Sequence, residues 1–211
     1  MKIHPKIIPL KNTIINTRRD FHKHPELSFE EKRTSKIVAE KLESFEIQTK
    51  RNIGKTGVVG ILKGQGNGPT IGLRADMDAL PIQETNDLPY KSINDGVMHA
   101  CGHDAHTAIL LGAAEALSKM KKSIKGEIRF IFQPAEEGYG GAKYMIEDGA
   151  IDNVDEIYGL HVWNYQKSGT VGIQSGPVMA AADIFTITIS GIGGHGATPQ
   201  GTVDSIIVAS H

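Results

Sequence analysis

The sequence predicts an α/β fold, in which a mixed sheet carries helices on both faces and the start of a second domain follows. Two observations lead to this prediction. Apolar residues recur at helical spacing in several stretches of the chain, and short β-rich runs lie between those stretches. Such an alternation of patterns is typical of helices packed against a sheet.

Two helices are expected at the start of the chain. Residues 5–22 place apolar side chains at a spacing that gives a helix one buried face. A second helix is expected over residues 30–45, because Ser28 and Glu31 have the spacing of a capping box before an apolar-faced stretch.

Further strands and helices are expected in the middle of the chain. The predicted strands are residues 57–62, 70–74, 127–132 and 156–162, and the predicted helices are residues 105–119 and 141–147. Asp104 is placed to cap the first of these helices. Its Ala, Gly and Leu side chains lie on nearly every side, which predicts burial against the sheet.

A domain boundary is expected at Gly176-Pro177, which interrupts this alternation. Residues 1–176 would form one domain, and residues 177–211 the start of a second. In the second part, residues 184–189 alternate like a strand. Residues 203–211 begin an apolar-faced helix that no Gly, Asn or Pro closes, so the chain is expected to end within an element.

The composition limits the classes of function. The 211 residues carry a net charge of −1 with dispersed basic residues, which argues against general nucleic-acid binding. No apolar run has the length of a membrane span or the character of a signal peptide. Cys101 is the single cysteine, so no intramolecular disulfide can form, as expected in a reducing compartment. We therefore expect a cytoplasmic protein without nucleic-acid or membrane contacts.

Polar clusters follow the predicted strands, at the ends where open α/β sheets bind ligands. Asp76 and Asp78 follow one strand and are either paired carboxylates of a site or turn acids that bind backbone amides. His161 ends another strand, and taken alone it is more typical of a buried core histidine.

Two further clusters point to metal. Cys101 and His103 lie one residue apart among the three histidines of residues 99–106, a pattern suited to a borderline-soft divalent ion. A lone free cysteine is more often a small buried hydrophobe. The adjacent Glu136 and Glu137 allow one acid to bind metal and the other to act as general base, the alternative being a solvated acidic turn. Four clusters at equivalent strand ends favour the metal site.

Six motifs in order give the chain a resemblance to a known family. They are RRDFHKHPEL (18–27), RADMDALP (74–81), HACGHDAH (99–106), QPAEEG (133–138), GLH (159–161) and GGHGA (193–197). Together they resemble the N-acyl-amino-acid amidohydrolase branch of the metallopeptidase family that includes carboxypeptidase G and aminoacylase. Hippurate hydrolases and auxin-conjugate hydrolases belong to that branch. The resemblance covers essentially the whole chain.

The resemblance implies roles for particular residues. The implied ligands of two divalent ions, zinc or manganese, are Cys101, His103, Glu137 and His161. Glu136 would be the general base, and His195 would polarise the scissile carbonyl from a lid domain. Asp76 and Asp78 lie where related peptidases use a His-x-Asp motif, and we expect them to support the ligands without binding metal.

The resemblance also implies a longer protein. Family members are nearly twice this length and carry another metal-binding histidine, together with the end of the catalytic sheet, after the lid. Residues 1–176 would be the N-terminal part of the metal-binding catalytic domain. Residues 177–211 would be the truncated start of an α+β, ferredoxin-like lid that forms a homodimer.

The expected reaction is metal-dependent hydrolysis of the amide bond of a small N-acyl-L-amino acid. Glu136 would take the proton of the attacking water and pass it to the leaving amine. Two alternatives remain open at this point. One is deacetylation of N-acetyldiaminopimelate, and the other is a catalytically inactive metal-binding or dimerising fragment.

We predict that the 211-residue chain alone hydrolyses N-acetyl amino acids negligibly and binds less than the full complement of metal. The apolar face that begins near residue 203 has no covering sequence, and a lone strand or hairpin is marginally stable and invites pairing with another copy. The check is the turnover of the purified chain, saturated with Zn²⁺ or Mn²⁺, beside a full-length relative. Comparable rates would contradict the prediction.

Overall fold

The structure is a computed structural model that describes residues 3–181 and 183–211. It divides into two compact units, one that ends at residue 168 and one that spans residues 169–211. The boundary predicted at Gly176-Pro177 stays a prediction, as does the assignment of the two parts to a catalytic domain and a lid.

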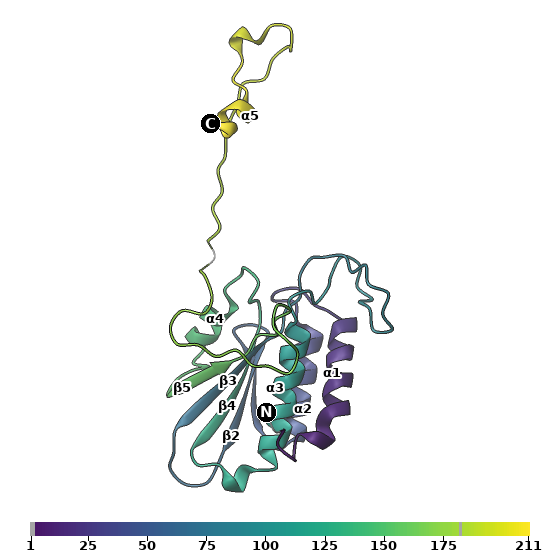
Figure 1. Ribbon diagram of the computed structural model, residues 1–211. Helices are drawn as coiled ribbons and strands as arrows, with labels where there is room; N and C mark the ends of the chain where they lie inside the picture. The colour runs from purple at the N-terminus through teal and green to yellow at the C-terminus, as the bar shows by residue number, and fades with distance from the viewer. Residues whose placement is uncertain (1–2, 182) are drawn as a thin grey trace. The chain divides into compact units, whose positions relative to one another are not determined.

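A five-stranded mixed sheet forms the centre of the first unit (Figure 1). Its strands, in spatial order, are β1 (Gln48–Ile53), β2 (Gly57–Lys63), β4 (Glu127–Gln133), β3 (Thr70–Asp76) and β5 (Glu156–Gly159). β3 is parallel to both of its neighbours, whereas β2 is antiparallel to β1 and β4. The carboxyl ends of β3, β4 and β5 therefore meet at one edge, where open α/β sheets bind ligands.

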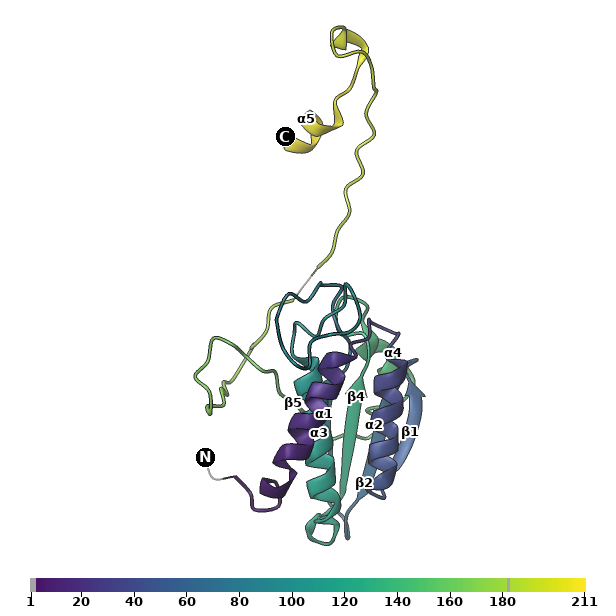
Figure 2. The ribbon, with the colours of Figure 1, turned by 90° about the vertical axis from the view of Figure 1, so that its right-hand side faces the viewer.

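Helices lie on both faces of this sheet, which confirms the predicted fold class. One face carries α1 (Lys11–Lys23), α2 (Lys32–Ser44) and α3 (His103–Ser118), and the other carries α4 (Gly141–Glu147) (Figures 1 and 2). Short 3₁₀ turns occupy Ile8–Leu10 and Lys121–Ser123. No helix in the described part of the chain has the length and apolarity to cross a membrane.

The alternation of side chains along β4 separates two cores. Phe130 and Phe132 are fully buried in a cluster with Leu111 of α3 and residues of α2. Ile131, between them, packs on the opposite face with Met145 of α4. Because neighbouring residues of a strand point to opposite faces, one apolar run supplies both cores.

α3 lies against the sheet and α1, as its apolar composition predicts. Gly112 permits the close approach of α1, since a β-carbon there would lie 2.5 Å from Ile14 Cδ1. The predicted cap is wrong: α3 begins at His103, after Gly102. Asp104 lies in the first turn, where its carboxylate accepts a hydrogen bond from the Ala105 amide. The same carboxylate contacts Arg18 and His22 of α1.

The predicted capping box at α2 is also wrong. Glu31 precedes the helix without a side-chain cap bond, and the amides of Arg33 and Thr34 donate to the carboxylate of Glu26. Ser28 donates instead to Asp78 at 2.7 Å. The capping-box spacing is therefore present, but tertiary partners bind both of its side chains.

Two strands differ from the prediction. β1 was not predicted, because its mostly exposed residues Gln48–Ile53 show no apolar alternation. It is an edge strand, and among the described residues it pairs with β2 alone. β5 ends at Gly159 and not at residue 162, because its last pairing with β3 joins Gly159 to Arg74. His161 therefore lies in the loop that follows β5.

The second unit contains little regular structure among its described residues. It has a 3₁₀ turn at Pro199–Gly201, the helix α5 (Ser205–Ser210) capped by Asp204, and a bridge between Ile192 and Val203. Residues 184–189, predicted as a strand, pair with no other described segment and are largely exposed. An extended segment becomes a strand only when a partner takes its backbone hydrogen bonds.

Candidate metal centre

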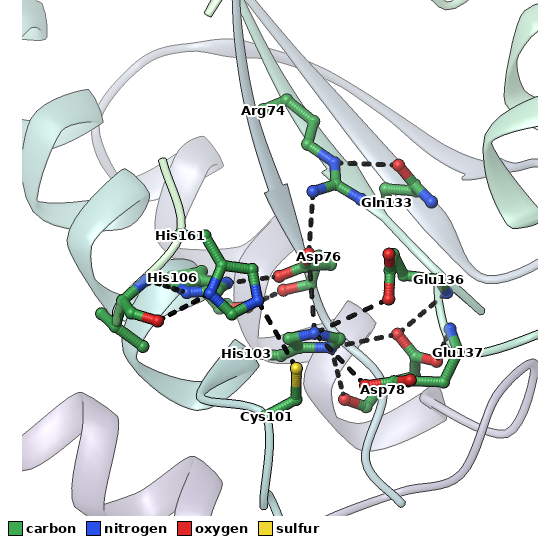
Figure 3. Close-up of polar contacts among 12 residues, drawn as sticks. Arg74, Asp76, Asp78, Cys101, His103, His106, Gln133, Glu136, Glu137 and His161 are labelled. Carbon is green, nitrogen blue, oxygen red and sulfur yellow. Dashed lines mark hydrogen bonds and ion pairs between the residues drawn. The ribbon is translucent and has the colours of Figure 1, made fainter. Parts of the chain in front are cut away.

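Five residues singled out in the sequence converge at one edge of the sheet in the first unit (Figure 3). They lie in the loops that follow β4 and β5 and at the start of α3, and they are Cys101, His103, Glu136, Glu137 and His161. Because β3, β4 and β5 are parallel, their following loops open at the same edge.

Three sets of potential ligand atoms share His103, and the set that it forms with Asp76 and His106 is wholly buried. Cys101, His103 and His161 offer ligand atoms within 4.8 Å of one another, and so do His103, Glu136 and Glu137. Cys101 Sγ lies 3.4 Å from His161 Nε2, and His103 Nε2 lies 3.8 Å from Glu137 Oε1. Thiolate, imidazole and carboxylate donors at such spacing suit borderline-soft divalent ions.

One ring nitrogen of His103, Nε2, is available to bind a metal ion. Its Nδ1 lies 2.8 Å from the backbone carbonyl of Asp78, which can only accept, so Nδ1 carries the proton. Among the described residues, His103 Nε2 and Glu137 Oε1 are buried atoms without a hydrogen-bond partner. Buried polar atoms are normally paired, and an ion between these two would satisfy both. The residues present therefore fit a divalent metal.

The electrostatics of the site favour a cation. Burial, reinforced by Glu137 and Glu136, raises the pKa of the Cys101 thiol to about 12. Burial and the charge of Glu137 also raise the pKa of Glu136. Burial opposes the charged form of His103, but the hydrogen bond with Asp78 and nearby carboxylates outweigh it and raise the pKa of His103. A bound cation would relieve this excess of negative charge and ionise the thiol.

Asp76 and His106 support the loop that carries His161. His106 Nδ1 lies 2.6 Å from Asp76 Oδ1, and His106 Nε2 accepts the backbone amide of Val162 at 2.9 Å. Burial opposes the ionisation of Asp76. The hydrogen bond from His106 and the positive charges of His103 and Arg74 outweigh burial and lower the pKa of Asp76 to about 2. Both ring nitrogens of His106 thus have hydrogen-bond partners, although His106 could otherwise form a ligand set with Asp76 and His103.

Gly102 allows this loop to approach α3. Its φ is 93°, a left-handed value that favours glycine, and a β-carbon there would lie 2.4 Å from Val162 Cγ2. The glycine between Cys101 and His103 therefore brings His161 next to them.

The remaining predicted residue, His195, lies in the second unit. Its exposed side chain accepts the amide of Ala197 at 3.1 Å. Its role at the scissile carbonyl stays a prediction. Sequence reasoning assigned no role to His106, whose available signal was its membership of the histidine cluster in residues 99–106.

Comparison with known proteins gives the family. Residues 72–208 match Peptidase family M20/M25/M40, and the chain belongs to this family. It is 50% identical over 202 residues to an N-acyl-L-amino acid amidohydrolase of Geobacillus stearothermophilus, covering 95% of this chain and 55% of the relative. It is 45% identical over 212 residues to the hippurate hydrolase of Campylobacter jejuni, covering 100% of this chain and 55% of the relative.

A solved structure supports the same assignment. The YXEP protein of Bacillus subtilis, described as a dinuclear metal binding peptidase from the M20 family, is similar with a TM-score of 0.78 at 46% identity. The match covers 81% of this chain and 48% of that chain. The resemblance seen in the sequence is confirmed, and the chain spans about half the length of the curated relatives it matches.

A separate buried ionic cluster joins α1, α3 and the loop after β3. His22 Nδ1 lies 2.8 Å from Asp104 Oδ2, and its Nε2 lies 3.2 Å from Glu84 Oε1. A histidine between two carboxylates donates to both only when it is protonated. The hydrogen bond with Asp104, opposed by burial and aided by the bond with Glu84, raises the pKa of His22.

We predict that His22 makes stability depend on pH. With a raised folded pKa, its contribution is complete below its unfolded pKa of about 6.5 and is lost as pH rises through the folded value. His22→Leu should therefore cost a few kcal/mol near about pH 6 and progressively less towards about pH 9. Urea unfolding across this range, with the exposed His4→Leu as control, measures the difference. A difference independent of pH would contradict the prediction.

Proposed function

We propose that the whole protein hydrolyses the amide bond of N-acyl-L-amino acids with two divalent metal ions. The observation that carries the proposal is the convergence of two donor sets on His103, whose free Nε2 faces a carboxylate oxygen that also lacks a partner. The names of the relatives, N-acyl-L-amino acid amidohydrolase and hippurate hydrolase, support this class of reaction.

The proposed metal ligands are the side chains that converge at the sheet edge. They are Cys101, His103, Glu137 and His161. Zinc or manganese is the proposed ion, because thiolate and imidazole suit zinc and carboxylates suit manganese. The solved structure of the YXEP protein, described as dinuclear, supports two ions.

Glu136 is the proposed general base. When bound, the ions lower the pKa of a water molecule and polarise the amide carbonyl. The Glu136 side chain is 42% exposed, and its Oε2 lies 3.9 Å from His103 Nε2, so it can face both solvent and substrate. Its raised pKa suits a group that takes a proton from water and returns it to the leaving amine.

The second unit is proposed to contribute the lid. His195 would polarise the substrate carbonyl, and residues 177–211 would pair with a second copy to form a homodimer. The exposed apolar side chains of Ile184 and Phe185 support that pairing. Sedimentation of the whole protein tests the dimer, and the cytoplasmic location stays a prediction.

We predict opposite effects for the two adjacent glutamates. In the whole protein, Glu136→Gln should lower kcat by about 10²–10⁴-fold and leave two ions bound, since it removes the proton acceptor and no ligand. Glu137→Gln should lose metal. Turnover of N-acetyl amino acids and metal analysis of both variants provide the measurement. The reverse pattern would exchange the two assignments.

We predict that bound metal protects Cys101 from alkylation. As a ligand, Cys101 must be a thiolate whose sulfur is bound to the ion and is therefore shielded from reagents. Iodoacetamide should modify Cys101 more slowly in the metal-loaded protein than in the same protein after removal of metal by chelator, at the same pH. Equal rates with and without metal would remove Cys101 from the ligand set.

A further inference from the structure

The loop that carries Glu136 and Glu137 is tied through its backbone to two buried carboxyl groups. The amide of Ala135 donates to Glu31 Oε1 at 2.8 Å. The next two amides each donate to an oxygen of Asp78 at 3.0 Å. Glu31 and Asp78 are both buried, and they come from distant parts of the chain. Three consecutive backbone donors are thus held by side chains from outside the loop.

Ala135 needs this support because of its backbone conformation. Its φ is 49°, in the left-handed region that side chains other than glycine rarely adopt. Such a residue persists where its surroundings hold it, and these residues cluster at functional sites. The turn at Ala135 takes the chain from the end of β4 directly into Glu136.

The side chain of Glu31 makes no capping hydrogen bond to α2, although its backbone carbonyl accepts the Ser35 amide. Glu26 binds the free amides at the start of that helix, and the other oxygen of Glu31 accepts the hydroxyl of Thr56. Burial raises the pKa of Glu31, and the bonds from the Thr56 hydroxyl and from the backbone amides of Glu31 itself, Ala135 and Phe29 lessen that rise. Burying the Glu31 carboxyl group costs free energy, and its hydrogen bond from the Ala135 amide offsets part of that cost.

We propose that Glu31 is a positioning residue for the reaction: its buried carboxyl group holds Ala135 in the left-handed turn that places Glu136. The inference rests on the proposed function, in which Glu136 is the general base. Asp78 holds the same loop but also lies 3.3 Å from His103 Nδ1, so substituting it would disturb a proposed ligand. Glu31 reaches the loop through the Ala135 amide alone, which allows positioning to be separated from metal binding.

Three variants isolate this contact. Glu31→Met keeps the length of the side chain but removes the acceptor for the Ala135 amide. Glu31→Gln keeps an acceptor oxygen and can donate to the hydroxyl oxygen of Thr56. Thr56→Val is the matched control, because it removes the hydroxyl that donates to the other oxygen of Glu31 and leaves the Ala135 bond in place.

The first readout does not require activity. Hydrogen exchange of the whole protein should show the Ala135 amide exchanging at least about tenfold faster in Glu31→Met, because this amide has lost its acceptor while those of Glu136 and Glu137 keep Asp78. Glu31→Gln and Thr56→Val should stay within about threefold of the wild type. Unchanged exchange in Glu31→Met would overturn the claim that this carboxyl group holds the loop.

The second readout is kinetic. Glu31→Met should lower kcat by about 10–100-fold with KM within about threefold and two ions retained, because small displacements of a catalytic group affect chemistry more than binding. Glu31→Gln should restore kcat to within about threefold. A loss of kcat no larger than that of Thr56→Val, or a loss confined to KM, would overturn the positioning role.

A double variant tests the proposal if Glu31→Met does not fold. Glu31→Met/Ala135→Gly should fold, since glycine adopts a positive φ without strain, and its kcat should stay low because the turn has lost its anchor. Wild-type kcat in that double variant would overturn the proposal. If the wild-type whole protein shows no hydrolysis, the proposed function fails, while the exchange measurement still decides whether Glu31 holds the loop.

Discussion

The arrangement of the site depends on the buried carboxylate of Asp78. It accepts the hydroxyl of Ser28 and the backbone amides of Glu136 and Glu137, and it lies 3.3 Å from His103 Nδ1. One side chain thus joins the end of β3, the start of α3 and the loop after β4. Burial opposes its ionisation, but these hydrogen bonds outweigh burial and lower its pKa, so the anchor stays charged.

The two buried ionic clusters of the first unit differ in their balance of charge. In the cluster around His22, one imidazolium and the guanidinium of Arg18 face two carboxylates, Asp104 and Glu84, so the partners neutralise one another. At the sheet edge, Glu136 and Glu137 lie beside the Cys101 thiol and raise its pKa. The buried atoms His103 Nε2 and Glu137 Oε1 lack hydrogen-bond partners there. The first arrangement holds helices together, whereas the second is the proposed metal site.

The sequence predicted the chemistry better than the supports that hold it. Cys101, His103 and Glu136 could be grouped because polar residues after parallel strands meet at one edge of a sheet. The contacts of Glu31 could not be predicted, because its local spacing to Ser28 matches a capping box while its partners lie 25 and 104 residues away. β1 was missed for a similar reason, since pairing with β2 and not its own pattern makes it a strand.

The most direct test of the account is the absorption spectrum of the protein loaded with Co²⁺. The account places Cys101 Sγ beside His161 and His103 as a metal ligand, so the wild type should show a thiolate-to-cobalt charge-transfer band. Cys101→Ser should lose that band and keep the weaker d–d absorption of a cobalt ion held by the remaining donors. A wild-type spectrum without the band, or one identical to that of Cys101→Ser, would contradict the account.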